Sequence, residues 1–256
     1  MHLTITERLR RKIANLVPVG IRQMRLAAGT LSITIDDFPK NAWENGRAIF
    51  EQHDVKATFY VSGGLCEKNW LGLPQYDVST LRAVHGSGHE IACHTFDHIN
   101  CVRSSPQALG ASIERNKMFV NDVLPDVALK NFAFPYGDLA YATKLRTAQQ
   151  FVSCRGVRPG VNIGRVETSH LLAVGLERRQ MHLHDFPQLI KEAADSRGWL
   201  ILFTHDISDQ PSDYGCRPTD LEAIINMAKE AGLRIVPVKD VFSRFHQMLS
   251  ILLFFC

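Results

Sequence analysis

The 256-residue sequence lacks several features that would mark a specialised protein. Its six cysteines form no CxxC pair and no compact framework, so we expect reduced thiols and a cytoplasmic location. With 29 basic and 26 acidic residues and no basic stripe interleaved with aromatics, the chain is not expected to bind nucleic acid. No apolar run approaches the roughly 20 residues of a membrane-spanning helix. What remains is an ordinary globular composition, 45% hydrophobic, in a chain long enough for one large domain.

Residues 1–28 are predicted to form a basic helical extension before a main domain at 29–243. The basic side chains of this segment cluster at residues 8–12, while Leu9, Ile13, Leu16 and Val17 share one helical face. We favour a helix packed on the main domain, with peripheral membrane contact as the alternative. A signal peptide is the weaker interpretation because Asn15 and Pro18 interrupt a short apolar stretch.

Residues 244–256 form an apolar C-terminal tail that is too short to span a bilayer. The tail could cover the main domain, touch a membrane surface or be disordered, and the sequence does not choose among these. The oligomeric state is equally open.

The main domain alternates between β-rich apolar runs and helical stretches. Three helix starts carry physical signals: Ser105-Pro106, Asp185-Phe186-Pro187 and the capping box that begins at Thr219, with Gly232 after the last helix. The repeated strand–helix order predicts a (β/α) barrel or an open parallel sheet in a single domain. Strands are expected near 31–36, 56–61, 89–93, 131–135, 151–154, 171–176, 199–204 and 233–238.

Polar residues follow several of these runs directly. Asp36 and Asp37 end the first run, His94 follows the third, Tyr136 the fourth and His205 the seventh. Because the C-terminal ends of parallel barrel strands meet on one face, we expect these side chains to converge.

An aspartate and two histidines make a three-ligand site that leaves room on Zn²⁺ for water. Asp37, His94 and His98 could supply these ligands, and Asp36 could accept a proton from the water. Two adjacent carboxylates repel each other, so a cation in the site would favour the pair. The alternatives are that the aspartates cap the turn before Pro39 and that HxxxH is a chance helical pair.

His205 closes a strand apolar enough to be buried on both faces, a position that suits a general acid for a departing amine. A structural histidine is the alternative. Pro135-Tyr136 belongs to a turn whose backbone N–H could stabilise an oxyanion, although a rigid turn with an aromatic side chain explains the same residues.

With these motifs the chain resembles the NodB-homology polysaccharide deacetylases, a carbohydrate esterase family, from about residue 31 to residue 238. The carrying segments are Thr34-Ile35-Asp36-Asp37, His94-Thr95-Phe96-Asp97-His98, Phe132-Ala133-Phe134-Pro135-Tyr136-Gly137 and Leu202-Phe203-Thr204-His205. The resemblance implies a distorted (β/α) barrel with about seven or eight parallel strands. It implies that Asp36 is the base, that Asp37, His94 and His98 bind the metal, that Tyr136 supplies an oxyanion-binding amide beside Pro135, and that His205 is the acid.

Three positions depart from the family pattern. Ala133 stands where many members have an arginine that orients the catalytic aspartate, and we expect Arg155 or Arg158 to supply that positive group. No carboxylate that tunes the acid histidine is evident, and Asp185 is our candidate. Phe38-Pro39 replaces a glycine that usually follows the Asp pair, which affects groove shape more than chemistry.

The resemblance implies a metal-dependent hydrolase that removes an N-acyl group, most often N-acetyl, from an amino sugar of a polysaccharide, oligosaccharide or glycan precursor. The alternatives are a deformylase or deacetylase of a lipid-linked sugar, an amidase of a small C–N substrate, and a non-catalytic carbohydrate-binding barrel. Zn²⁺ is the expected metal, although Co²⁺ and Ni²⁺ suit the same ligands.

Overall fold

The computed structural model describes residues 3–242. The sequence alternates between helices and strands along its whole described length, as expected. The helices are α1 (Ile5–Leu16), α2 (Lys40–Gln52), α3 (Val78–Gly86), α4 (Pro106–Val123), α5 (Tyr141–Ala148), α6 (Phe186–Ser196) and α7 (Pro218–Glu230), with 3-10 turns η1 (Gly63–Leu65), η2 (Pro135–Gly137) and η3 (Met181–Leu183).

The predicted strands all occur, several of them shorter than expected, and four further short strands join them. The main strands are β2 (Thr30–Asp37), β3 (Thr58–Val61), β6 (Glu90–Cys93), β7 (Asn131–Ala133), β8 (Ser153–Arg155), β10 (Val174–Gly175), β11 (Trp199–Thr204) and β12 (Arg234–Ile235). The additional strands are β1 (Ile21–Gln23), β4 (Asn69–Trp70), β5 (Leu73–Pro74) and β9 (Arg165–Glu167).

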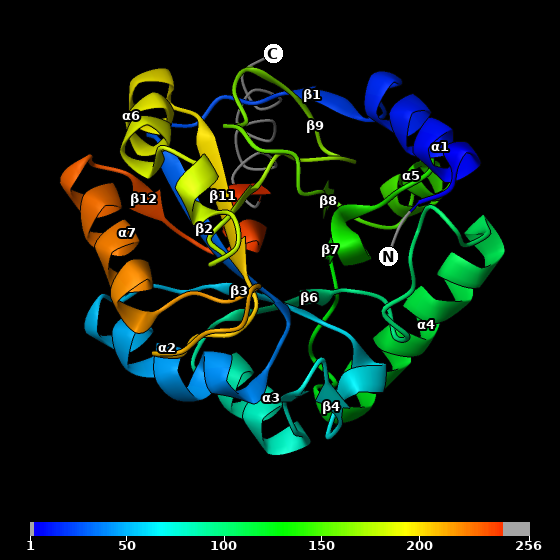
Figure 1. The fold of residues 1–256 in the computed structure, drawn as a ribbon, viewed down its shortest axis with the longest axis horizontal. Helices are drawn as coiled ribbons and strands as arrows, with labels where there is room; N and C mark the ends of the chain where they lie inside the picture. The colour runs from blue at the N-terminus through cyan, green and yellow to red at the C-terminus, as the bar shows by residue number, and fades with distance from the viewer. Residues whose placement is uncertain (1–2, 243–256) are drawn as a thin grey trace, which may run out of the picture.

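The main strands form one parallel sheet of eight strands in the order β10-β11-β2-β3-β6-β7-β8, with β12 paired to β2. A parallel bridge between Arg155 and Leu171 links β8 to the segment before β10 and narrows the gap between the two ends of the sheet. Figure 1 shows α2 to α7 outside this curled sheet, with the β1–β9 pair at the gap between α6 and α1. The predicted single-domain distorted barrel is therefore confirmed.

Strand β2 shows how the sequence alternation is used. Every residue of the strand is buried. Leu31, Ile33 and Ile35 belong to the apolar core between the sheet and the helices. On the opposite side, Ser32 Oγ donates to Val236 O at 2.8 Å and Thr34 Oγ1 donates to Leu202 O at 2.9 Å. The small polar side chains thus point into the barrel and lead along the strand to Asp36.

Two of the three predicted helix starts are confirmed. The Ser105 hydroxyl accepts from Ala108 N at 3.1 Å, and the Asp185 carboxylate accepts from Gln188 N at 3.0 Å. The start predicted at Thr219 is wrong, because α7 already begins at Pro218 and Asp220 Oδ2 accepts from the Arg217 N–H. Proline at the first helical position sets this boundary, since its fixed φ suits a first turn.

The expected packing of the N-terminal helix is wrong in one respect. Helix α1 lies beside α5, but Ala14 is its only buried residue. The apolar face predicted to pack on the barrel is exposed instead: Leu9 is 57% exposed, Ile13 43%, Leu16 70% and Val17 41%. The described residues contain no helix long and apolar enough to cross a membrane. The predicted tail at 244–256 lies outside the described residues.

Candidate active site

The C-terminal ends of β2, β6, β8 and β11 surround a pocket of about 420 Å³. The predicted convergence is present, because the pocket brings together residues that lie up to 178 positions apart in the sequence. Its lining includes Asp36, Asp37, Trp70, Leu71, His94, His98, Tyr136, Val157, Glu177, Arg179, His205 and Tyr214.

Asp37, His94 and His98 form a buried cluster at one wall of this pocket. Asp37 is the last residue of β2, and His94 follows β6 directly. Asp37 Oδ1 lies 3.0 Å from His98 Nε2 and 3.5 Å from His94 Nε2. One ligand atom from each side chain lies within 4.8 Å of the others, a spacing that a single divalent ion could bridge.

The electrostatics of the cluster favour a cation. Asp37 Oδ1 is buried and, among residues 3–242, no donor satisfies it with hydrogen-bond geometry. Burial alone would raise the pKa of Asp37, but His98 and His205 lower it well below its usual range. A buried, ionised acceptor without a hydrogen bond is costly unless a positive group faces it, so these three residues fit a divalent metal.

His94 is oriented to act as a ligand. Its Nδ1 lies 2.8 Å from Ala133 O, and because a carbonyl only accepts, Nδ1 must carry the proton. Burial lowers the pKa of His94 to about 4, so the ring is neutral at pH 7. Its Nε2 lone pair is left for the side of the ring that faces Asp37.

Asp36 lies beside the cluster and is bound by Arg155. The guanidinium donates from Nη2 to both carboxylate oxygens, with 2.5 Å to Oδ2. Arg155 is fully buried at the end of β8 and is held over the ring of Tyr60 at 5.1 Å and that of Phe203 at 5.0 Å. The positive group expected to replace an arginine at position 133 therefore comes from the next strand in the sheet.

Arg158 does not share this role. Its side chain is exposed, and within the described residues it makes no ion pair with Asp36. Strand β8 ends at Arg155, and of the residues that follow it Val157, not Arg158, lines the pocket.

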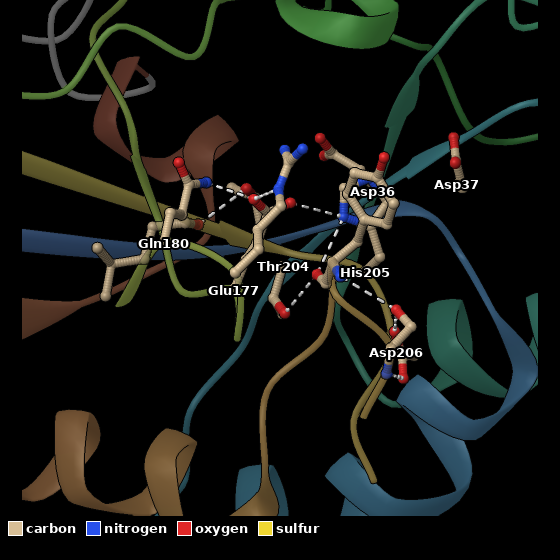
Figure 2. A network of polar contacts seen from close by, with 12 residues as sticks. Asp36, Asp37, Glu177, Gln180, Thr204, His205 and Asp206 are labelled. Atoms are coloured by element: carbon tan, nitrogen blue, oxygen red, sulfur yellow. Dashed lines mark hydrogen bonds and ion pairs between the residues drawn. The ribbon is translucent and has the colours of Figure 1, made fainter. Parts of the chain in front are cut away.

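His205 follows β11 and lies at another wall of the pocket, with Glu177 behind it (Figure 2). His205 Nδ1 is 3.2 Å from Glu177 Oε1. Burial would lower the pKa of His205, but the contact with Glu177 and the charges of Asp37 and Asp36 raise it to about 9. Glu177 is itself fully buried and accepts from Arg179 Nε at 3.0 Å. The acid candidate is thus a charged imidazole at neutral pH.

The expectation that Asp185 tunes this histidine is wrong. Asp185 caps the start of α6, whereas Glu177 contacts His205. A signal for Glu177 is present in the sequence, since this carboxylate directly follows the predicted strand 171–176, as His94 and His205 follow theirs.

The turn at Pro135–Gly137 lines the pocket on the side of the Asp37–His94–His98 cluster. The Tyr136 ring centroid lies 4.6 Å from that of His98, and its side chain is half-exposed at the rim. Trp70, from the β4–β5 hairpin, contacts the other side of His98 with ring centroids 5.7 Å apart. Two aromatic side chains therefore contact the histidine of this cluster that lies nearest the mouth of the pocket, His98.

Backbone strain is concentrated around the pocket. Nine non-glycine residues of the described chain have positive φ, and among them are Asp37 (60°), His98 (51°) and Tyr136 (62°), all in the lining. Phe38, in place of the family glycine, has φ of 70° and is held by stacking on Tyr76 at 4.9 Å. Such conformations persist when surrounding packing fixes them, and they are frequent at functional sites.

A sequence model of the polysaccharide deacetylase family matches residues 24–155, just over half of the chain. This range contains three of the four motifs described above. The chain belongs to the polysaccharide deacetylase family. Among curated relatives, a chitin disaccharide deacetylase of Vibrio alginolyticus is 34% identical over 100 residues, which are 35% of this chain and 22% of that protein. A chitin deacetylase of Colletotrichum lindemuthianum is 32% identical over 84 residues, 32% of each chain. This member of the family therefore spans at most a third of the length of these curated relatives.

Solved structures share the fold of this deacetylase family member. Bacillus subtilis PdaA, a family 4 carbohydrate esterase, superposes with a TM-score of 0.60 at 13% identity, covering 93% of this chain and 89% of that one. An acetyl xylan esterase of Clostridium thermocellum in complex with a cobalt ion gives 0.57 at 19% identity, with 84% and 90% coverage. A Bacillus anthracis family 4 pseudoenzyme also gives 0.57, at 15% identity, with 89% and 70% coverage.

Proposed function

We propose that this protein is a metal-dependent hydrolase that removes an N-acyl group, most often N-acetyl, from an amino sugar of a polysaccharide, oligosaccharide or glycan precursor. The observation that carries the proposal is the meeting of two sets of side chains in one pocket. Asp37, His94 and His98 make a ligand set, while Asp36 and His205 make a base and an acid.

The ligand set fits a divalent ion, and Zn²⁺ is proposed as the native metal, with Co²⁺ and Ni²⁺ as alternatives that accept the same donors. When bound, such an ion supplies Lewis-acid activation of water and of the substrate carbonyl. The neutral His94 ring and the ionised Asp37 are already in the protonation states that ligands require.

Asp36 acts as the general base that accepts a proton from the attacking water. Arg155 binds both of its oxygens and fixes the plane of the carboxylate at the pocket floor. This ion pair has a positioning role, because a base contributes to rate only when it lies within hydrogen-bond reach of the proton it removes.

His205 acts as the general acid that protonates the departing nitrogen. An acid must carry its proton at the working pH, and Glu177 provides this by stabilising the imidazolium. The backbone N–H of Tyr136 is proposed to stabilise the oxyanion, with Pro135 fixing the turn. The aromatic rims at Trp70 and Tyr136 suit the apolar face of a sugar ring.

The fold alone does not establish activity, because a structurally similar Bacillus anthracis protein is a pseudoenzyme. The proposal therefore rests on the complete set of acid, base and ligand side chains in this chain. A non-catalytic carbohydrate-binding barrel would need neither the Arg155–Asp36 pair nor the Glu177–His205 pair.

The test combines metal analysis with product release. The purified protein is loaded with Zn²⁺, Co²⁺ or Ni²⁺ and incubated with chitin oligosaccharides, N-acetylglucosamine derivatives and peptidoglycan fragments, and released acetate is measured. One equivalent of bound metal and metal-dependent acetate release are expected. Stoichiometric metal binding without hydrolysis of any acylated sugar would instead support the binding barrel.

A second candidate is a deformylase or deacetylase of a lipid-linked sugar. The observation that favours it is the exposed aliphatic face of α1, which lies near the Tyr136 wall through the contact of Arg11 with Asp138. Formate and acetate released from N-formyl and N-acetyl amino sugars on a lipid carrier, compared with water-soluble analogues, separate the two candidates.

A further inference from the structure

Helix α1 reverses the usual arrangement of an amphipathic surface helix. Such a helix normally buries its apolar stripe and exposes its charges. In α1 the aliphatic residues are exposed, with Ile5 at 86% and Leu16 at 70%, whereas only Ala14 is buried. At 100° per residue, Ile5, Leu9, Ile13 and Leu16 lie within an arc of about 80° that points away from the protein.

Polar contacts hold the inner face of this helix to the barrel. Near its start, Arg103 Nε lies 3.0 Å from Glu7 Oε1, and Arg11 Nη1 lies 3.2 Å from Asp138 Oδ1. At its end, the buried Lys144 ammonium donates to Ala14 O at 2.5 Å and to Val17 O at 2.7 Å. Helix α1 lies at the edge of the molecule (Figure 1). It is attached by ionic and carbonyl contacts, while its aliphatic side chains are exposed.

The charges around the aliphatic face are positive. Arg8 and Lys12 flank one side of the arc and Arg10 the other, and all three side chains are exposed. Within residues 3–242 none of the three forms an ion pair, in contrast to Glu7 and Arg11 of the same helix.

The charge of the whole chain is divided in the same way. Residues 1–28 hold six basic residues and one acidic residue, while the remaining 228 residues hold 23 basic and 25 acidic ones. The net positive charge of the protein is thus confined to the segment that carries the exposed helix.

We propose that α1 binds the surface of an anionic membrane. The aliphatic side chains of Ile5, Leu9, Ile13 and Leu16 enter the boundary between headgroups and acyl chains, and Arg8, Arg10 and Lys12 contact the anionic headgroups. The positive rim selects a lipid surface over a second copy of this chain, because two such rims facing each other would repel. This inference does not depend on the proposed catalytic activity.

The position of α1 places the proposed membrane contact next to one side of the pocket. Asp138, the partner of Arg11, directly follows the η2 turn that carries Tyr136, and Asn100 Nδ2 donates to its other oxygen at 3.0 Å. The membrane contact therefore lies beside the Tyr136 and His98 side of the pocket.

The test is co-sedimentation of the full-length protein with large unilamellar vesicles at about 0.1 M salt. One set of vesicles contains phosphatidylcholine alone, and the other contains phosphatidylcholine with about 30 mol% phosphatidylglycerol. The variant Leu9→Gln/Ile13→Gln is expected to bind the anionic vesicles at least tenfold more weakly than the wild type. The variant Arg8→Gln/Lys12→Gln is expected to lose about 30-fold on anionic vesicles and little on neutral ones. All of these positions are exposed, and far-UV circular dichroism checks that the variants fold.

A matched control replaces exposed apolar residues elsewhere. Met118 on α4 is 65% exposed and Leu183 in η3 is 68% exposed, so Met118→Gln/Leu183→Gln removes comparable apolar surface. This control is expected to bind like the wild type.

Three outcomes would overturn the proposal. The first is that the wild type binds neither kind of vesicle. The second is that Leu9→Gln/Ile13→Gln binds as tightly as the wild type, which would assign membrane contact to another segment. The third is a concentration-dependent dimer in sedimentation velocity that the same variant abolishes, without vesicle binding, which would make the face an interface between copies.

Discussion

His94 and His205 line the same pocket and differ in protonation. Burial lowers the pKa of His94 to about 4, whereas the pKa of His205 is raised to about 9 despite burial. The difference lies in the charge near each Nδ1. His94 Nδ1 faces only the neutral carbonyl of Ala133, whereas His205 Nδ1 lies 3.3 Å from the carbonyl of Tyr214 and 3.2 Å from the carboxylate of Glu177. The added carboxylate therefore distinguishes the charged His205 from the neutral His94.

The largest effect is expected from removing one of the three proposed metal ligands. His94→Ala removes one of three donors, so we expect metal affinity to fall by more than about 100-fold and metal-dependent hydrolysis to fall to background. Metal content and acetate release are measured on the same sample. The exposed His182 serves as the control, since His182→Gln should change neither.

Removing the proposed general base should lower the rate of hydrolysis and leave metal binding intact. Asp36→Asn keeps the shape of the side chain but cannot accept a proton, so we expect kcat to fall by roughly 10²–10⁴ with metal stoichiometry unchanged. Asp97→Asn is the matched control, because Asp97 lies between the two histidine ligands in sequence but bonds Ser112 and Arg115 instead. Near-normal turnover in Asp36→Asn would refute the base assignment.

The Arg155–Asp36 pair should be visible in stability. Arg155→Gln leaves a buried carboxylate without its partner, a change that typically costs about 3–5 kcal/mol of unfolding free energy. Arg158→Gln, at an exposed position three residues later, should stay within about 0.5 kcal/mol. Urea unfolding at pH 7 compares the two variants, and equal losses would mean that the pair does not carry the stability.

The smallest effect is expected from the titration of His205. Since the raised pKa keeps His205 protonated below about 9, wild-type kcat should decline as the pH rises through that value. Glu177→Gln removes the carboxylate, so the pKa of His205 falls and this decline moves to lower pH, with a loss of about tenfold at pH 8–9.

The same variant makes a stability prediction of definite sign. A folded-state pKa above the unfolded value stabilises the protein fully below pH 6.5, and this contribution is lost as the pH rises through about 9. The stability difference between wild type and Glu177→Gln should therefore shrink from pH 6 to pH 10. Asp185→Asn is the control and should leave the pH profile of kcat unchanged.

The sequence was most informative where one local rule governs the structure. Strand runs such as 199–204 were predictable from apolar continuity, and the meeting of Asp36, His94 and His205 followed from their place at the C-terminal ends of strands. The same rule applies to Glu177, which follows the run 171–176, but the sequence contains no geometric link between His205 and either Glu177 or Asp185.

Tertiary context decided the features that the sequence could not show. Periodicity identifies an apolar face of α1 but cannot say whether that face turns inward, because the orientation depends on Glu7, Arg11 and the distant Lys144. In the same way, the choice of Arg155 over Arg158 depends on where β8 ends. Contacts between positions more than 100 residues apart carry no local pattern.

The contact between Arg155 and Asp36 joins strands that stand far apart in the sheet, since β8 is its last strand and β2 its third. The guanidinium thus reaches across the interior of the barrel from the seam where the sheet is least continuous. Any event that opened this seam would withdraw the cation from the carboxylate. In this molecule, the ion pair that positions Asp36 therefore depends on closure of the barrel at this seam.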